Sequence, residues 1–140
     1  MDNTLNIPVA EIMTRQLITV STETSLQEVH RITGEHSIRH LPVLRKGKLA
    51  GIISRTDLER VSFMNDPNSA NVVEAMLPLL NAENLMTRSP VTLTADQTVR
   101  DAAEIFKDGK IHALPVIEAE RIAGIITTTD LIKLMLRAGE

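Results

Sequence analysis

Apolar and polar residues follow a pattern along the chain that occurs twice. A short β-rich run comes first, at 16–20 and again at 90–93, and a segment with apolar residues at helical spacing follows it. Two apolar runs then predict a pair of strands, "LPVL" with "LAGII" and later "LPVI" with "IAGII", and a second helical segment closes each copy. The pattern predicts the order β-α-β-β-α, twice, which is an α+β fold with α/β-like character.

The two copies also match residue by residue. Shifting the chain by 73 positions aligns 13–58 with 86–131 without a gap, and 16 of these 46 positions are identical. A match of this length predicts two copies of one unit, packed about a pseudo-twofold axis. We expect a first repeat in 1–64, a linker with a short helix in 65–81, and a second repeat in 82–140.

Composition narrows the class of protein. The chain has 15 basic and 18 acidic residues, a net charge of −3 and no cysteine, so neither a nucleic-acid surface nor a thiolate metal site is expected. It has no run of 18 apolar residues and no signal-peptide pattern, so we expect a cytoplasmic protein without a membrane span. Phe63 and Phe106 are the only aromatic residues, so a flat ligand would have to lie between aliphatic side chains.

The two sets of motifs resemble those of a known family. The pattern "IMTR…ITV…LPV…GIISRTDL" returns as "LMTR…VTL…LPV…GIITTTDL". It resembles a tandem pair of cystathionine-β-synthase (CBS) domains, also called a Bateman module. The resemblance implies a non-enzymatic regulatory module that binds AMP, ADP or ATP in clefts between the repeats. It also implies a homodimer that signals to a regulated protein by a conformational shift. S-adenosylmethionine and NAD rank after these ligands, and no cofactor is required.

The resemblance assigns ligand contacts to three places in each repeat. These are the edge of the first strand, the residues around "LPV", and the junction between the last strand and its helix, where Gly51 and Gly124 also lie. In the first repeat the contact residues are Ile18, Thr19, Arg39, His40, Pro42, Ser54, Thr56 and Asp57. In the second repeat they are Val91, Thr92, His112, Ala113, Pro115, Thr127, Thr129 and Asp130.

The chemistry of these residue types suits a nucleoside. One carboxylate can accept hydrogen bonds from both hydroxyls of a ribose, and the absence of a side chain at a glycine lets a ligand or another backbone approach. The base would lie in an aliphatic slot of Ile18, Pro42, Val91 and Pro115. The same Ser/Thr-x-x-Asp spacing also matches a helix-capping box, so Asp57 and Asp130 can be either ligand contacts or helix caps.

Basic residues are unequally distributed between the repeats. The first repeat carries six near its expected pocket: Arg39, His40, Arg45, Lys46, Lys48 and Arg55. The second has fewer, so we expect the two sites to differ in affinity or in preferred phosphate number. Neither repeat contains a glycine-rich phosphate loop, a metal-ligand spacing or a catalytic triad, which favours reversible binding over catalysis.

One alternative stays open at this point. The chain could be a structural dimerisation or docking module with vestigial pockets, using the apolar segments 76–80 and 131–136.

Overall fold

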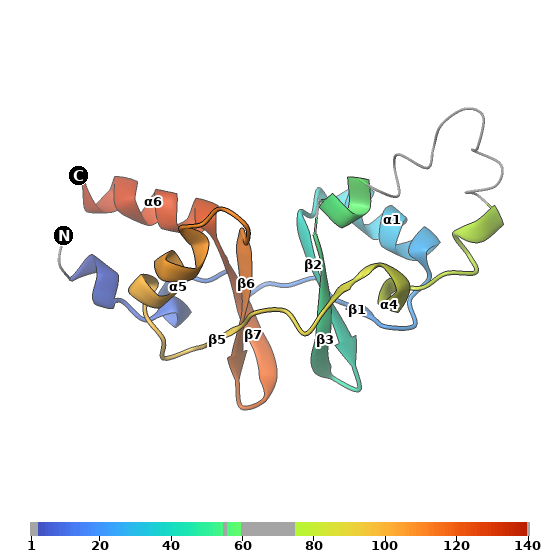
Figure 1. Ribbon diagram of the computed structural model, residues 1–140, viewed down its shortest axis with the longest axis horizontal. Coiled ribbons are helices and arrows are strands. Elements are labelled where there is room, and N and C mark those ends of the chain that lie inside the picture. The colour runs from blue at the N-terminus through green and yellow to red at the C-terminus, as the bar shows by residue number, and fades with distance from the viewer. Residues whose placement is uncertain (1–2, 55, 60–74, 140) are drawn as a thin grey trace. The chain divides into compact units, whose positions relative to one another are not determined.

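Two compact units make up the protein. The computed structural model describes residues 3–54, 56–59 and 75–139. Contacts within the chain separate unit 1, Met1–Leu17 together with Val91–Glu140, from unit 2, Ile18–Pro90 (Figure 1). Unit 1 is therefore discontinuous in sequence, whereas unit 2 is one stretch of chain.

Unit 2 is built on a four-stranded sheet with the order β1-β2-β3-β4. The strands β1 and β2 are parallel, and the other neighbours are antiparallel. Residues 56–59 continue from β3 as helix. The remaining elements are, in chain order, β1 (Val20–Ser21), α1 (Leu26–His36), β2 (His40–Arg45), β3 (Lys48–Ser54), α4 (Ala82–Leu85) and β4 (Thr87–Arg88).

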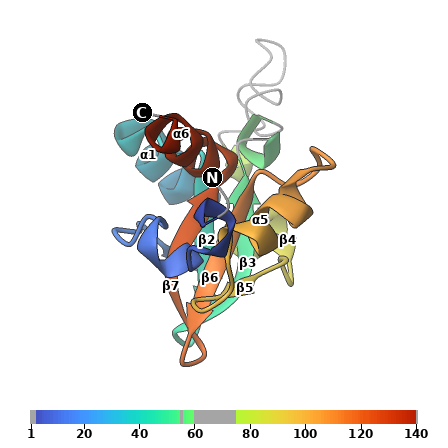
Figure 2. The same cartoon turned by 90° about the vertical axis from the view of Figure 1, so that its left-hand side faces the viewer.

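Unit 1 repeats this plan on a three-stranded sheet with the order β5-β6-β7. In this unit α5 lies in contact with both α6 and the short 3-10 helix η1 (Figures 1 and 2). Its elements are η1 (Thr4–Asn6), η2 (Val9–Glu11), β5 (Leu93–Thr94), α5 (Val99–Phe106), β6 (Ala113–Glu118), β7 (Arg121–Thr127) and α6 (Thr128–Ala138).

Strand register is the same in the two sheets. Val20 lies opposite Val43 in unit 2, and Leu93 lies opposite Val116 in unit 1, each 73 positions later. The β2–β3 and β6–β7 hairpins also share a register irregularity at equivalent positions, after Val43 and after Val116. The predicted α+β class and the repeated strand and helix order are confirmed.

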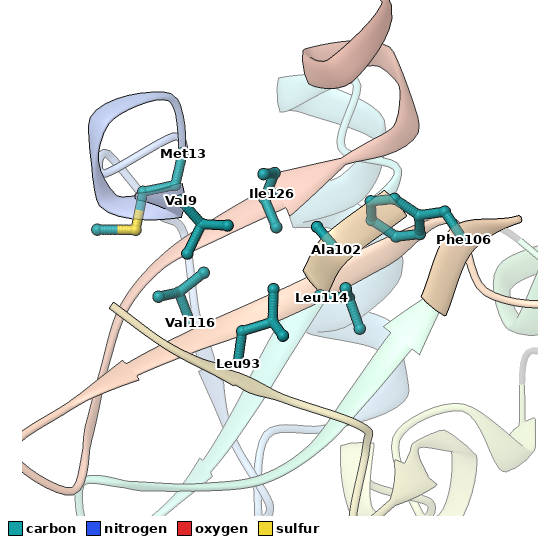
Figure 3. Packing of buried hydrophobic residues seen from close by; sticks show 8 residues of the cluster. All are labelled: Val9, Met13, Leu93, Ala102, Phe106, Leu114, Val116 and Ile126. Atoms are coloured by element: carbon teal, nitrogen blue, oxygen red, sulfur yellow. The ribbon is translucent and has the colours of Figure 1, made fainter. Parts of the chain in front are cut away.

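Each unit has its own apolar core. In unit 1 the buried residues come from all three strands, from α5 and from the N-terminal segment (Figure 3). Unit 2 has the equivalent cluster around β2 and β3, with Ala82 and Met86 supplied by the segment before β4. The labelled residues of Figure 3 are Val9, Met13, Leu93, Ala102, Phe106, Leu114, Val116 and Ile126.

The N-terminal segment of the first repeat packs on the sheet of the second. The amide of Val9 donates to the carbonyl of Gln97 at 2.8 Å, and Thr14 exchanges two hydrogen bonds with Ile125 in β7, at 2.8 and 3.0 Å. The sequence repeat places this segment in the first copy, whereas in the fold it belongs to unit 1, with the sheet of the second copy.

The equivalent segment of the second repeat packs on the sheet of the first. The amide of Ala82 donates to the carbonyl of Thr24 at 2.8 Å, and β4 pairs with β3, with Thr87 opposite Ile52. The boundaries 1–64, 65–81 and 82–140 follow the sequence repeat and stay a prediction. Residues 71–74 of the expected linker helix lie outside the described residues, whereas Ala75 and Met76 are helical and a turn follows at 77–79.

Helix starts follow the predicted caps with one difference. Thr98 and Asp101 form the complete capping box of α5. Ser25 accepts a hydrogen bond from the amide of Glu28 at 3.2 Å, but the Glu28 carboxylate binds the guanidinium of Arg31 instead of closing the box. This ion pair lowers the pKa of Glu28, because the Arg31 hydrogen bond stabilises its charged form. Within the described ranges, no helix is long and apolar enough to cross a membrane.

Candidate nucleoside-binding ends of the two sheets

The junction between β7 and α6 places an aspartate at a helix start. The amide of Thr127 donates to Oδ2 of Asp130 at 2.8 Å, and the Thr127 hydroxyl lies 3.0 Å from the same oxygen. In return, the amide of Asp130 donates to Oγ1 of Thr127 at 3.2 Å. Thr127 and Asp130 therefore form a capping box through Oδ2, which leaves Oδ1 for another contact.

The junction after β3 has the same local geometry. The amide of Ser54 donates to Oδ2 of Asp57 at 2.9 Å, the Ser54 hydroxyl donates to the same oxygen at 2.9 Å, and the amide of Asp57 donates to Ser54 Oγ at 3.3 Å. Both junctions thus use one carboxylate oxygen to start a helix. The capping interpretation of this spacing holds in both repeats, and it leaves the second oxygen outside the capping contacts.

Register brings the other expected residues of unit 1 to the same end of its sheet. Ala113 at the start of β6 lies opposite Thr127 at the end of β7, and the carbonyl of His112 accepts a hydrogen bond from the amide of Thr128 at 3.1 Å. Val91 and Thr92 directly precede β5, which runs parallel to β6, so they lie toward the start of β6.

The same end of the sheet in unit 2 gathers the equivalent residues. His40 at the start of β2 lies opposite Ser54 at the end of β3. Ile18 and Thr19 directly precede β1, which is parallel to β2, and Arg39 is exposed just before β2. Each sheet therefore has one end where the expected residues of all three places converge.

The expected aliphatic slot is only partly open. Ile18 and Val91 are 39% and 48% exposed and can contact a ligand within their own units. Pro42 and Pro115 are fully buried in the cores, so they support the strands and do not line an open surface. Thr56 and Thr129 are exposed at the helix starts.

The glycines of the junction strands receive a backbone and not a ligand. A Cβ added at Gly124 would lie 2.6 Å from the sulfur of Met13 and 2.8 Å from the carbonyl oxygen of Thr14. At Gly51 the corresponding distances are 2.5 Å to the sulfur of Met86 and 2.6 Å to the carbonyl oxygen of Thr87. The methionine and threonine of the "MTR" motif thus pack on these glycines, and the equal spacing of methionine and glycine in the repeats is the signal that links them.

The expected cluster of basic residues near the pocket of the first repeat is wrong for its hairpin members. Arg45 pairs with Lys48 at the turn of the β2–β3 hairpin, the opposite end from His40 and Ser54. Five residue steps at roughly 3.3 Å per residue separate the two ends. Lys46 lies in the turn itself, and Arg55 lies outside the described residues.

The hairpin instead carries an ion cluster. Arg45 Nη2 lies 2.5 Å from Glu83 Oε2, and Arg88 Nη2 lies 3.4 Å from Glu83 Oε1. The Arg45 hydrogen bond, with a smaller contribution from Arg88, holds the pKa of Glu83 below its ordinary value of 4.5. These cations thus neutralise a carboxylate of their own unit.

A shallow depression of about 500 Å³ lies elsewhere on unit 1, at the opposite ends of β5 and β6. Two carboxylates, Asp96 and Glu118, are among its lining residues, so it does not suit a phosphorylated ligand. Within residues 3–54, 56–59 and 75–139, no group of three or more His, Asp or Glu side chains is placed to hold a metal ion.

Comparison with known proteins gives the chain its relatives. Two solved structures share its fold over nearly their full length. CBSX2 in complex with AMP has a TM-score of 0.79 and 25% identity, covering 96% of this chain and 99% of that one. The CBS domain pair of protein MJ0100, in complex with 5-methylthioadenosine and S-adenosyl-L-methionine, has a TM-score of 0.76 and 28% identity, covering 94% and 97%.

The sequence relatives include much longer enzymes. Inosine-5'-monophosphate dehydrogenase of Korarchaeum cryptofilum is 34% identical over 117 residues, which are 83% of this chain and 22% of the enzyme. A CBS domain-containing protein of Dictyostelium discoideum is 28% identical, with 97% of this chain and 96% of that protein aligned. The chain thus spans less than a quarter of the length of the dehydrogenase, whereas it spans nearly all of the Dictyostelium protein.

The family itself follows from the match to a family model. The CBS domain model matches twice, at residues 9–63 and 82–137, which together are most of the chain. These two matches agree with the repeat in the sequence and with the repeated register of the sheets. The chain therefore belongs to the CBS domain family and carries two CBS domains in tandem.

Proposed function

We propose that this protein is a non-enzymatic regulatory module that binds an adenine-containing ligand, with AMP, ADP or ATP first and S-adenosylmethionine or NAD after them. The observation that carries the proposal is the convergence at one end of a sheet of Asp130, Thr127 and Val91 in a CBS pair. Solved structures of this fold are complexes with AMP in CBSX2 and with S-adenosyl-L-methionine in MJ0100, which supports an adenine ligand.

The sugar is the part of the ligand for which the site is best suited. Asp130 uses Oδ2 in its capping box, and Oδ1 accepts no hydrogen bond from the described residues. Adjacent ribose hydroxyls donate to a carboxylate, and charge-assisted bonds of this kind are stronger than neutral ones. The exposed side chain of Val91 offers an apolar surface on which a base can be buried.

Phosphate is held weakly in this proposal. His112 is exposed beside the junction of unit 1, and Arg39 takes the equivalent place in unit 2. The chain has no glycine-rich loop that could surround a phosphate with backbone amides. A single basic side chain holds a phosphate less firmly than such a loop, so occupancy of the site follows the ligand concentration, as a sensor requires. Ligand binding then shifts the conformation of the module, and a regulated protein responds to that shift.

A thermal-shift panel tests the proposal. AMP, ADP, ATP, S-adenosylmethionine and NAD are compared with GMP, and AMP is compared with 2′-deoxy-AMP, which lacks one hydroxyl of the diol. A ligand at 100 times its Kd stabilises the native state by about 2.7 kcal/mol, which raises Tm by several degrees. The proposal fails if no adenine compound raises Tm, and the diol contact fails if 2′-deoxy-AMP performs as well as AMP.

A second candidate function is a dimerisation module. Ile132, Met135 and Leu136 are exposed on α6, where they lie at spacings of three and four residues and form one apolar face. A second copy of the chain would cover this face and remove it from water. Sedimentation velocity over a range of concentrations, with Leu136→Glu as the interface variant and Glu104→Gln on α5 as control, distinguishes this function from ligand binding.

A further inference from the structure

The two junctions share one local geometry but differ in their access to solvent. The amide-to-Oδ2 distances are 2.9 Å at Ser54 and Asp57 and 2.8 Å at Thr127 and Asp130. Asp57 is only 2% exposed, whereas Asp130 is partly exposed. Since the capping bonds are equivalent, the difference arises from what surrounds each carboxylate and not from how the helix begins.

Burial closes the junction of unit 2 to a sugar. Asp57 is 2% exposed as a residue, so its side chain is buried, and a ribose, which is larger than a water molecule, has no access to it. Asp57 also makes an interaction beyond its capping box. Among the described residues, no buried side-chain oxygen lacks a hydrogen-bond partner, as is general for buried polar and charged groups.

The junction of unit 1 keeps the features that a sugar needs. Asp130 is partly exposed, its Oδ1 has no hydrogen bond among the described residues, and Thr129 beside it is exposed. Val91, at the same end of the sheet, is 48% exposed. A partly exposed aspartate and an exposed apolar side chain therefore lie at one end of the sheet within one unit.

Basic side chains lie at the site end of both units. The greater number of basic residues in the first repeat led us to expect sites that differ in affinity or in preferred phosphate number, but Arg45 and Lys48 lie at the other end of the hairpin. Among the described residues, the basic side chains at the site end are Arg39 and His40 in unit 2 and His112 in unit 1. The inference therefore rests on access to the carboxylate, which is buried in unit 2 and partly exposed in unit 1, and not on the number of basic side chains.

We infer that the two CBS domains are unequal as ligand sites: the Thr127–Asp130 junction binds the sugar diol, and the Ser54–Asp57 junction is a structural helix start. Each chain then binds one adenine ligand. This inference rests on the proposed function, and it adds to it the number of ligands and the repeat that holds them.

Calorimetry and NMR with AMP test the inference. Titration of the wild-type chain gives one AMP per chain, and the amide resonances of Thr127 and Asp130 shift more than those of Ser54 and Asp57. Asp130→Asn lowers the affinity at least about 10-fold, because a charge-assisted bond is lost. Asp101→Asn is the matched control, since Asp101 closes the same capping box on α5 and should leave the affinity unchanged.

The outcomes distinguish failure of the inference from failure of the proposed function. Two AMP molecules per chain, or shifts concentrated at Ser54 and Asp57, overturn the inference and leave the proposed function standing. An equal loss in Asp130→Asn and Asp101→Asn also overturns it, because helix capping would then explain the effect. If AMP and the other adenine compounds produce neither heat nor shifts, the proposed function and the inference both fail. The NMR comparison uses the wild-type chain and does not depend on the folding of any variant.

Discussion

Gly124→Ala tests how the N-terminal segment is held on the sheet of unit 1. The added Cβ would lie 2.8 Å from the carbonyl oxygen of Thr14, and ordinary contact begins at 3.4 Å, so about 0.6 Å of movement is required. That oxygen accepts a 3.0 Å hydrogen bond from the amide of Ile125. A shift of this size away from β7 takes the bond beyond the usual range.

The expected cost combines a strained contact with a weakened hydrogen bond. Overpacking costs about 1–3 kcal/mol, and a lost hydrogen bond adds about 0.5–1.5 kcal/mol. Replacing glycine by alanine returns about 0.4–1 kcal/mol through the unfolded state. We therefore expect Gly124→Ala to lower the free energy of unfolding by about 2 kcal/mol.

Urea unfolding at constant pH measures the effect, and amide exchange of Val9, Thr14 and Ile125 locates it. Gly34→Ala is the control, because a Cβ at Gly34 in α1 meets nothing within 4 Å. It should raise stability by about 0.5–1 kcal/mol, as alanine does in a helix interior. If Gly124→Ala is as stable as Gly34→Ala and leaves exchange unchanged, the packing of the segment on Gly124 is refuted.

Two further predictions concern the core and the ion cluster. Leu114→Ala removes a side chain with no exposed surface and should cost about 2–5 kcal/mol in urea unfolding; a loss below 1 kcal/mol would contradict its place in the core. Glu83→Gln should reduce stability at pH 7, and the difference from wild type should shrink below pH 4.5. The pKa of Glu83 is lowered in the folded state, so its contribution is present above 4.5 and disappears as the pH falls through the lowered value. Unfolding curves at pH 7 and pH 3 check this, and an equal difference at both would exclude the Arg45 contact as its cause.

Much of the fold could be predicted from the sequence because the chain contains its own comparison. Equal spacing of "LPV" and "AGII" in the two repeats predicted strands, and the structure pairs them with the same register. The capping spacing at Thr127 and Asp130 likewise predicted the helix start that the structure shows. Local patterns of this kind are sufficient because turns, caps and strand periodicity depend on neighbouring residues.

The remaining features depend on contacts between distant residues. No local pattern shows that Met13 packs on Gly124, 111 positions away, and not on Gly51 of its own repeat. The placement of Arg45 was wrong because closeness in sequence to a site residue says little once a hairpin carries the chain to the far end of a sheet. The different exposure of Asp57 and Asp130 is likewise a property of the folded surroundings, since the two motifs are nearly identical.

The reciprocal packing of the segments before Arg15 and Arg88 decides how this chain can be divided. A fragment cut at the repeat boundary would carry a segment that packs on the sheet of the other repeat, and its own sheet would lose the segment that packs on it. The stretch 18–90 holds a sheet together with its cover and is the piece to express alone. Residues 1–17 and 91–140 would need a new covalent connection, as in a circular permutant, to become independent. A single CBS domain can therefore be excised from this protein only if the cut keeps each sheet with the segment that packs on it.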